Sequence, residues 1–324
     1  MLAVRDHRLD ALLHRGRHAD VWAATRLGPG GFETPVALKI LNATAAATPA
    51  QVRAFLAEAS TAAAVSDRNV VQVRELICEH GSYAFSMERV RGWPLRALLA
   101  STSARHRVPI AIAIALVRDA ARGLQAVHEA GLVHRHVTPD NLMIGRSGEV
   151  IVIDFGGAIP RGAIPPAELL DPIYASPLLR THRPVDGRID TYSLGALLDA
   201  LIPRSPEVPL ALRSIIARAI DPERTFVEPQ ALEVALDLVS IREGWLVPPA
   251  YVAAYASDLA RRDDLEGGEV VMLDASMMRG PGRRELRLLD AIEQTPTHAP
   301  ARTRTVTTES ESWDELPTTA SARR

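Results

Sequence analysis

Alternating apolar and polar positions predict that the first third of the chain is rich in β-strands. From Leu12 to Ala24 the alternation runs through a bend at Gly16, as in a hairpin. Further strands are predicted over Val36–Ile40, Asn69–Val73 and Ser82–Met87. Cys78 falls between the last two strands and is interpreted as a small core residue. Apolar residues at helical spacing from Gln51 to Val65 predict one helix within this region.

Helical periodicity dominates the rest of the chain. The clearest helix is predicted over Pro109–Ala130, with Gly131 as its stop. An apolar strand, Val150–Ile153, follows it. Further helices are predicted over Ala211–Ile220, Pro229–Val239 and Pro249–Arg262. Beyond them, Glu269–Asp274 could add one strand, and a short charged helix is predicted to end near Glu293.

Composition narrows the classes of protein to which the chain can belong. The 324 residues are 47% hydrophobic and 23% charged, as in a globular protein, and a formal net charge of -2 argues against a nucleic-acid partner. Cys78 is the only cysteine, which excludes an intrachain disulfide and a multi-cysteine metal site. The longest apolar run, Ile110–Val117, is far shorter than the roughly 20 residues that span a bilayer. Because Met1–Asp10 carries charges where a signal peptide is apolar, we expect a cytoplasmic protein without a membrane partner.

The end of the chain differs in composition from the rest. From Thr295 onward Thr, Ser, Pro, Arg and Glu dominate, which predicts a disordered Ser/Thr-rich tail over residues 295–324. Ser310–Leu316, around Trp313, has the form of a short linear motif for a protein partner. An unselected tail explains this stretch equally well.

One short stretch carries the most specific chemical signal. Residues 134–141 read His-Arg-His-Val-Thr-Pro-Asp-Asn, and thirteen residues after Asn141 an apolar strand ends in Asp154-Phe155-Gly156. The first stretch resembles the catalytic loop of eukaryotic-type protein kinases, which reads His-Arg-Asp, any residue, Lys, Pro, any residue, Asn. The second resembles their Asp-Phe-Gly motif. The resemblance covers about Leu9 to Ile241 and is closest to the compact bacterial serine/threonine kinases.

This resemblance implies an α+β fold with two lobes, a small β-rich N-lobe with one main helix and a larger, mostly helical C-lobe. The kinase-like domain would span 9–241, with the N-lobe at about 9–88 and the C-lobe at about 91–241. Residues 1–8 would form an N-terminal extension, and 242–294 a partly helical C-terminal extension.

Most of the family's nucleotide-binding positions are retained, so the resemblance implies ATP with Mg²⁺ as the cofactor. Lys39 would contact the phosphates and pair with Glu58, although an ordinary strand lysine beside an ordinary helix glutamate is the alternative. Asn141 and Asp154 would hold the metal ion. The adenine would be sandwiched by Val21, Ala37 and Met143 and would meet backbone groups of Glu88 and Val90.

The loop that covers the phosphates in kinases is glycine-poor here. Only Gly16 of its three glycines is present, and His14 and Ala19 stand at the other two positions. Glycines let a backbone approach phosphates closely, so nucleotide binding is expected to be weak.

The residues that would act on the transferred phosphoryl group are replaced. His136 stands where the family has its catalytic aspartate, and Thr138 stands where it has a lysine. Asp171 replaces a threonine that meets both of those positions, and Leu178 replaces a glutamate. Because His136 and Asp171 change together, we expect them to pair. Asp190 remains, at the position that ties down the catalytic-loop backbone in the family.

These departures favour a pseudokinase, a kinase-fold module that binds a nucleotide weakly and acts as a scaffold or regulator. Its protein partner would contact the C-lobe or the tail around Trp313. The alternatives are an active ATP-dependent serine/threonine kinase that uses His136 as its base, and a kinase-fold nucleotidyl transferase.

Overall fold

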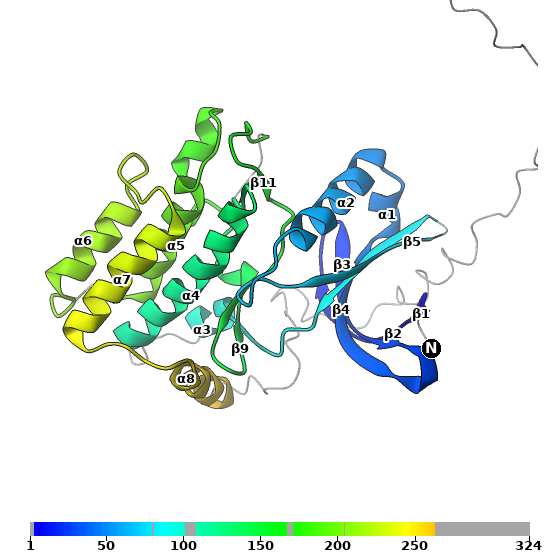
Figure 1. Cartoon of the computed structure of the whole chain (residues 1–324), viewed down its shortest axis with the longest axis horizontal. Helices are drawn as coiled ribbons and strands as arrows, with labels where there is room; N and C mark the ends of the chain where they lie inside the picture. The colour runs from blue at the N-terminus through cyan, green and yellow to red at the C-terminus, as the bar shows by residue number, and fades with distance from the viewer. Residues whose placement is uncertain (1–2, 80, 101–107, 167–170, 204, 263–324) are drawn as a thin grey trace, which may run out of the picture.

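The chain folds into two lobes joined side by side (Figure 1). The computed structural model describes residues 3–79, 81–100, 108–166, 171–203 and 205–262. The first lobe is a β-sheet with helices on one side, and the second consists mainly of helices. This architecture confirms the predicted two-lobed α+β fold.

The N-lobe sheet has six antiparallel strands in the order β1-β2-β3-β4-β6-β5. They are β1 (Ala3–Val4), β2 (His7–Arg15), β3 (Ala19–Leu27), β4 (Glu33–Leu41), β5 (Val73–Glu79) and β6 (Ser82–Glu88). The predicted hairpin is therefore β2–β3. Residues 1–8, expected as an extension, contribute β1 and the first two residues of β2 to this sheet.

The turn of the β2–β3 hairpin explains why Gly16 is a glycine. Its amide donates a hydrogen bond to the carbonyl oxygen of Ala19 over 3.0 Å, and a Cβ atom at Gly16 would collide with that same oxygen. The tight turn alone therefore requires this glycine.

Two helices follow β4 and cover one face of the sheet. They are α1 (Ala43–Ala46), capped by the side chain of Asn42, and α2 (Pro49–Ala63), which confirms the predicted helix. Phe55 and Ala59 of α2 pack against Phe85 of β6, with the two phenyl rings 5.1 Å apart. This contact fixes the side of the sheet on which Glu58 of α2 lies.

Two predictions about the edge of this sheet were wrong. The strand predicted over Asn69–Val73 begins only at Val73, because Asn69 and Val71 instead exchange backbone hydrogen bonds with Val152 in the C-lobe. Cys78 lies within edge strand β5 and is exposed, whereas its neighbour Ile77 is buried. Successive side chains of a strand point to opposite faces, which places Cys78 outside the core.

The C-lobe is built around α4 (Ile110–Glu129), a helix buried along most of its length that confirms the clearest sequence prediction. Short strands and turns line the lobe boundary: β7 (Gly92–Pro94), β8 (Leu132–Val133), β9 (Leu142–Gly145), β10 (Val150–Val152), β11 (Ile159–Pro160) and the 3-10 turns Pro139–Asn141 and Pro177–Thr181. The remaining helices are α3 (Leu95–Ala100), α5 (Arg188–Leu201), α6 (Leu210–Ala219) and α7 (Pro229–Glu243). Among the described residues, no helix is long and apolar enough to cross a membrane.

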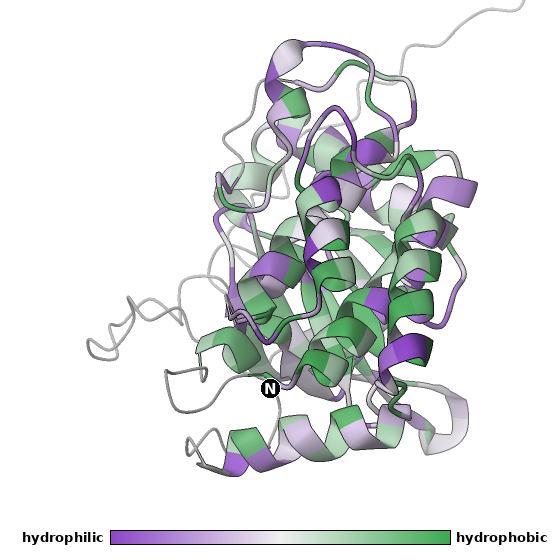
Figure 2. Cartoon of the chain, turned by 90° about the vertical axis from the view of Figure 1, so that its left-hand side faces the viewer, coloured by the Kyte–Doolittle hydropathy of each residue, from purple (hydrophilic) through white to green (hydrophobic). Residues whose placement is uncertain are grey.

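A last helix, α8 (Pro249–Arg262), lies across the bottom of the C-lobe with hydrophobic and polar residues on different faces (Figure 2). Val252, Ala256 and Leu259 belong to the main core, so this predicted helix is part of the folded domain. The helix also sits directly on the β9–β10 turn, where a Cβ atom at Gly148 would collide with the carbonyl oxygen of Pro249. The strand expected at 269–274, the helix ending near Glu293 and the tail around Trp313 lie outside the described residues.

Candidate active site

The backbone of the catalytic loop is held by a buried carboxylate in the first turn of α5. Asp190 accepts hydrogen bonds from the amides of His134 over 2.8 Å and Arg135 over 2.7 Å, as expected from the sequence. Burial disfavours the charged form of Asp190, but the contacts with His128 and His134 together outweigh it and lower the pKa of this carboxyl group. The conformation of the loop is thus fixed independently of its reactive side chains.

The support from His128 was not found in the sequence. Its Nε2 lies 2.8 Å from Asp190 Oδ2, and its Nδ1 lies 3.2 Å from Glu228 Oε2. The other carboxylate oxygen of Glu228, Oε1, pairs with Arg161. Burial favours the neutral ring, but the contacts with Asp190 and Glu228 together outweigh burial, so the pKa of His128 is raised. His128 lies in the last turn of the long helix α4, six residues before His134, and nothing in its spacing distinguishes it from a solvent-facing residue.

Aromatic and backbone contacts join the catalytic loop to the Asp154–Gly157 segment. The rings of His134 and Phe155 meet edge to face at 5.2 Å, and Arg135 Nε donates to the carbonyl oxygen of Gly157 over 2.6 Å. Arg135 and Asp154 both have left-handed backbone conformations, with φ of 64° and 63°. Non-glycine residues adopt this region rarely, and such strain tends to occur at functional sites.

Lys39, Glu58 and Asp154 form a charged cluster between the lobes. Lys39 Nζ lies 2.5 Å from Glu58 Oε1 and 3.1 Å from Asp154 Oδ1, so the expected ion pair is present. Burial disfavours the Lys39 ammonium, but Asp154 and Glu58 outweigh it and raise its pKa. Burial disfavours the ionised form of Asp154, but the attraction of Lys39 and the hydrogen bonds of its neighbours together lower its pKa, whereas burial raises the pKa of Glu58 to about 7. Lys39 therefore compensates the charge of two carboxyl groups, and Asp154 is the one whose ionised form is favoured more strongly.

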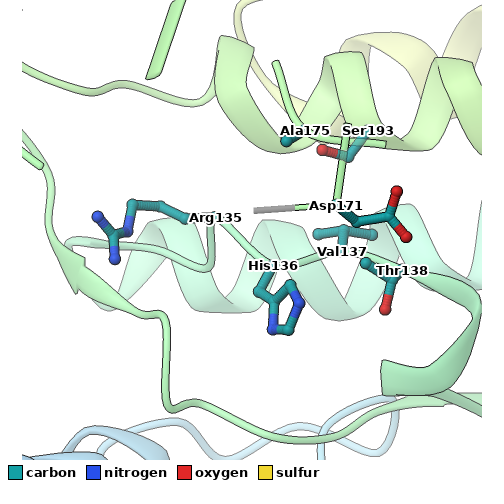
Figure 3. A pocket seen from close by; sticks show the side chains of 7 residues that line it. All are labelled: Arg135, His136, Val137, Thr138, Asp171, Ala175 and Ser193. Carbon is teal, nitrogen blue, oxygen red and sulfur yellow. The ribbon is translucent and has the colours of Figure 1, made fainter. Parts of the chain in front are cut away.

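His136 contacts Asn141 on the far side of the cleft. Asn141 Nδ2 lies 2.8 Å from the carbonyl oxygen of His136 and 3.0 Å from its Nδ1. Figure 3 shows the imidazole pointing away from Asp171 and Thr138, toward the pale blue ribbon of the N-lobe. The residue at the family's aspartate position thus points toward the lobe that carries Lys39 (Figure 3).

The expected pairing of His136 with Asp171 is absent from the contacts of the described residues. Asp171 Oδ1 instead accepts a hydrogen bond from the amide of Ile173 over 2.9 Å, and its carboxylate lies beside Thr138 in a small pocket (Figure 3). Thr138 is 4% exposed. The lysine position of the loop is therefore filled by a buried, uncharged side chain.

The residues expected to surround adenine come from both lobes. Val21 is paired with Lys39 across β3 and β4, and Ala37 lies two residues before Lys39, so the three side chains share one face of the sheet. Met143 is buried on β9 of the C-lobe. Glu88 ends β6, and Val90 follows it in the segment that connects the lobes, while Gly16 lies in the β2–β3 turn.

The residues present fit a magnesium nucleotide. The side chain of Asp154 is 38% exposed, and Asn141 uses its amide nitrogen toward His136, which leaves its Oδ1 for a cation. The described residues contain no group of three or more His, Cys, Asp or Glu side chains that could hold a metal by themselves. Two protein oxygens suit Mg²⁺, because this ion keeps several waters and binds substrate phosphates.

Comparison with known proteins agrees with this geometry. Residues 13–228 match the family described as the protein kinase domain, so the chain belongs to the protein kinase family.

Curated relatives are bacterial kinases of both specificities. The chain is 31% identical over 287 residues to the tyrosine-protein kinase MasK of Myxococcus xanthus, and the aligned region covers 81% of this chain and 44% of that protein. It is 32% identical over 203 residues to the serine/threonine-protein kinase PkaB of Streptomyces coelicolor, covering 59% of this chain and 47% of the relative. Identity to the serine/threonine-protein kinase PknL of Mycobacterium bovis is 34% over 176 residues, covering 53% and 43%. The matches span less than half the length of these relatives.

Proposed function

We propose that this protein is a nucleotide-binding member of the kinase family with impaired phosphoryl transfer, acting through protein contacts as a pseudokinase. The observation that carries the proposal is the difference between the two sides of the cleft. Lys39, Glu58 and Asp154 are assembled for a magnesium nucleotide. The catalytic loop presents His136 and buried Thr138, without a carboxylate or a cation at those positions.

Phosphoryl transfer depends mainly on positioning and on electrostatic support of the transferred group. Removing one such donor commonly reduces the rate by about 10²–10³-fold. Thr138 removes the loop cation, and His136 removes the carboxylate that orients an acceptor hydroxyl. A chain with both changes retains the means to bind ATP and loses much of the means to transfer its phosphate.

An active kinase that uses His136 as its base is the second candidate. The intact Lys39–Glu58 pair and the Asp154 conformation favour it, because both are needed for transfer in the family. In that case the enzyme would be an ATP-dependent serine/threonine phosphotransferase or, with a different acceptor, a nucleotidyl transferase.

One purified sample separates these candidates. We expect magnesium ATP to raise the melting temperature of the protein, and the rise to be lost in Lys39→Ala. With labelled ATP we expect no label on the protein or on a generic protein substrate. Label that appears and then vanishes in Asp154→Ala would establish the second candidate, whereas the absence of any thermal shift would exclude nucleotide binding altogether.

The protein partner and a cytoplasmic location are also part of this proposal. Support for a contact through the C-lobe comes from α7, where Val234, Leu238 and Ile241 are 51%, 65% and 63% exposed at helical spacing. The other expected contact, around Trp313, lies outside the described residues. We expect deletion of 295–324 and the single change Leu238→Ser to separate the two locations in an affinity capture from the source cell.

A further inference from the structure

The contacts of Asn141 determine which nitrogen of His136 carries a proton. Asn141 Nδ2 lies 2.8 Å from the carbonyl oxygen of His136, which can only accept a hydrogen bond. This contact identifies the amino end of the Asn141 side chain, so the amide orientation follows from chemistry. The same nitrogen lies 3.0 Å from His136 Nδ1.

An amino group has two hydrogens, one for each of these acceptors. Nδ1 of His136 must therefore be the unprotonated nitrogen that accepts, and the neutral ring carries its proton on Nε2. Nε2 has no hydrogen-bond partner among the described residues, and it reaches solvent. The imidazole thus offers an N–H donor on its free side.

The free side of the ring is directed toward the N-lobe, which carries the lysine expected to contact the phosphates of a nucleotide. The imidazole points toward the N-lobe (Figure 3), from which Lys39 reaches Asp154 across the cleft. Its Cβ atom is also next to Gly157, at 3.1 Å from where a Cβ on that glycine would lie. The base of the His136 side chain is therefore next to the segment that begins with Asp154.

We propose that His136 is a phosphate-binding residue, whose Nε2–H donates a hydrogen bond to an oxygen of the terminal phosphate of a bound nucleoside triphosphate. This inference rests on the proposed nucleotide binding and goes beyond it by assigning His136 a role. A base needs a lone pair directed at the acceptor hydroxyl, and in this tautomer the free nitrogen has none. A donor at this position offsets part of the loss of the cation at Thr138, because hydrogen bonds to charged groups are among the stronger ones.

The tautomer can be measured directly and needs no substitution. We expect ¹⁵N NMR of the protein without nucleotide to show neutral His136 protonated at Nε2. In Asn141→Asp the amino donor becomes a carboxylate, which accepts, so the proton is expected to move to Nδ1. Finding Nδ1–H in the wild-type protein would overturn the inference, and this readout does not depend on nucleotide binding.

Calorimetric titration with ATP and ADP tests the ligand. We expect His136→Ala to weaken ATP binding by roughly 10-fold or more, because the loss of a hydrogen bond to a charged group accounts for a factor of that order. ADP lacks the terminal phosphate, so its binding is expected to change little. His182→Asn is the matched control, because His182 is exposed, lies outside the cleft and has a left-handed backbone that asparagine tolerates. If His136→Ala binds ATP as tightly as the wild type, the inference fails while the proposed function stands. If the wild-type protein binds neither nucleotide, both fail.

Discussion

The two sides of the inter-lobe cleft differ in how their charges are compensated. On the N-lobe side, Lys39 makes ion pairs with Glu58 and Asp154, and all three residue types match the family. On the C-lobe side, the loop backbone is anchored by Asp190, yet its reactive positions hold His136 and Thr138. One side of the site therefore keeps the residue types of the family, whereas the other side keeps only the backbone frame of the loop.

The residues that hold the catalytic-loop backbone, Asp190 and His128, form the loop anchor, and they do not depend on the side chains that the loop carries. Asp190 and His128 form a buried hydrogen-bonded contact that constrains the backbone whatever residue stands at position 136. Because the frame is maintained by other residues, His136 and Thr138 can change without loss of the fold. The catalytic loop thus keeps its shape although two of its side chains depart from the family pattern.

The largest expected effect comes from removing the anchor. Asp190→Ala leaves the amides of His134 and Arg135 without their acceptor and removes the hydrogen-bond partner of the buried His128 Nε2. Breaking such a buried pair costs about 3–5 kcal/mol, so the free energy of unfolding measured in urea is expected to fall by that amount. Asp199→Ala, on the partly exposed side of the same helix, is the control and is expected to cost at most about 1 kcal/mol. Equal losses in the two variants would contradict the role of Asp190.

A smaller loss is expected on the other side of the cleft. Lys39→Ala removes the one cation that Glu58 and Asp154 share, but Glu58 can take up a proton because burial raises its pKa to about 7. We expect a loss of about 3 kcal/mol in urea unfolding. The exposed pair of Arg96 and Asp140 supplies the control, since Arg96→Ala is expected to cost at most about 1 kcal/mol. An unchanged stability in Lys39→Ala would mean that the cluster is not coupled as its distances indicate.

Restoring the loop chemistry sharpens the comparison further. The double variant His136→Asp with Thr138→Lys returns both reactive positions to the family pattern. We expect label transfer from ATP to rise by about 10²-fold or more over the parent chain, and to vanish when Asp154→Ala is added. No gain in a folded double variant would show that a further departure from the family, such as Asp171, also blocks transfer.

The smallest effect concerns pH and involves the anchor alone. Since the pKa of His128 is raised in the folded protein, its contribution to stability is full below its unfolded value of about 6.5. That contribution is lost as the pH rises through the folded value. Urea unfolding between pH 6 and 9 is therefore expected to show a decline in stability that His128→Gln reduces. A decline of the same size in both proteins would assign it to other groups.

The sequence predicted the fold, because several motifs agreed in order and spacing. Hydrophobic periodicity located α2, α4 and α8 to within two residues. It misplaced β5, since a short apolar run such as Asn69–Val73 reads equally well as a strand and as a buried connection. Cys78 was also misassigned, because whether a residue of an edge strand is buried depends on the face of the sheet to which its side chain points.

What the sequence determined by itself is which functional groups exist: a lysine, a glutamate and an aspartate retained at family positions, and a carboxylate and a cation lost from the loop. The tertiary structure decided what those groups contact. His136 meets Asn141, Asp171 turns to its own backbone beside Thr138, and His128 joins Asp190 from another helix. A hydrogen bond requires its donor and acceptor to be within a few tenths of an ångström of the ideal distance and to point toward each other. Residue identity and spacing along the chain fix neither the distance nor the direction.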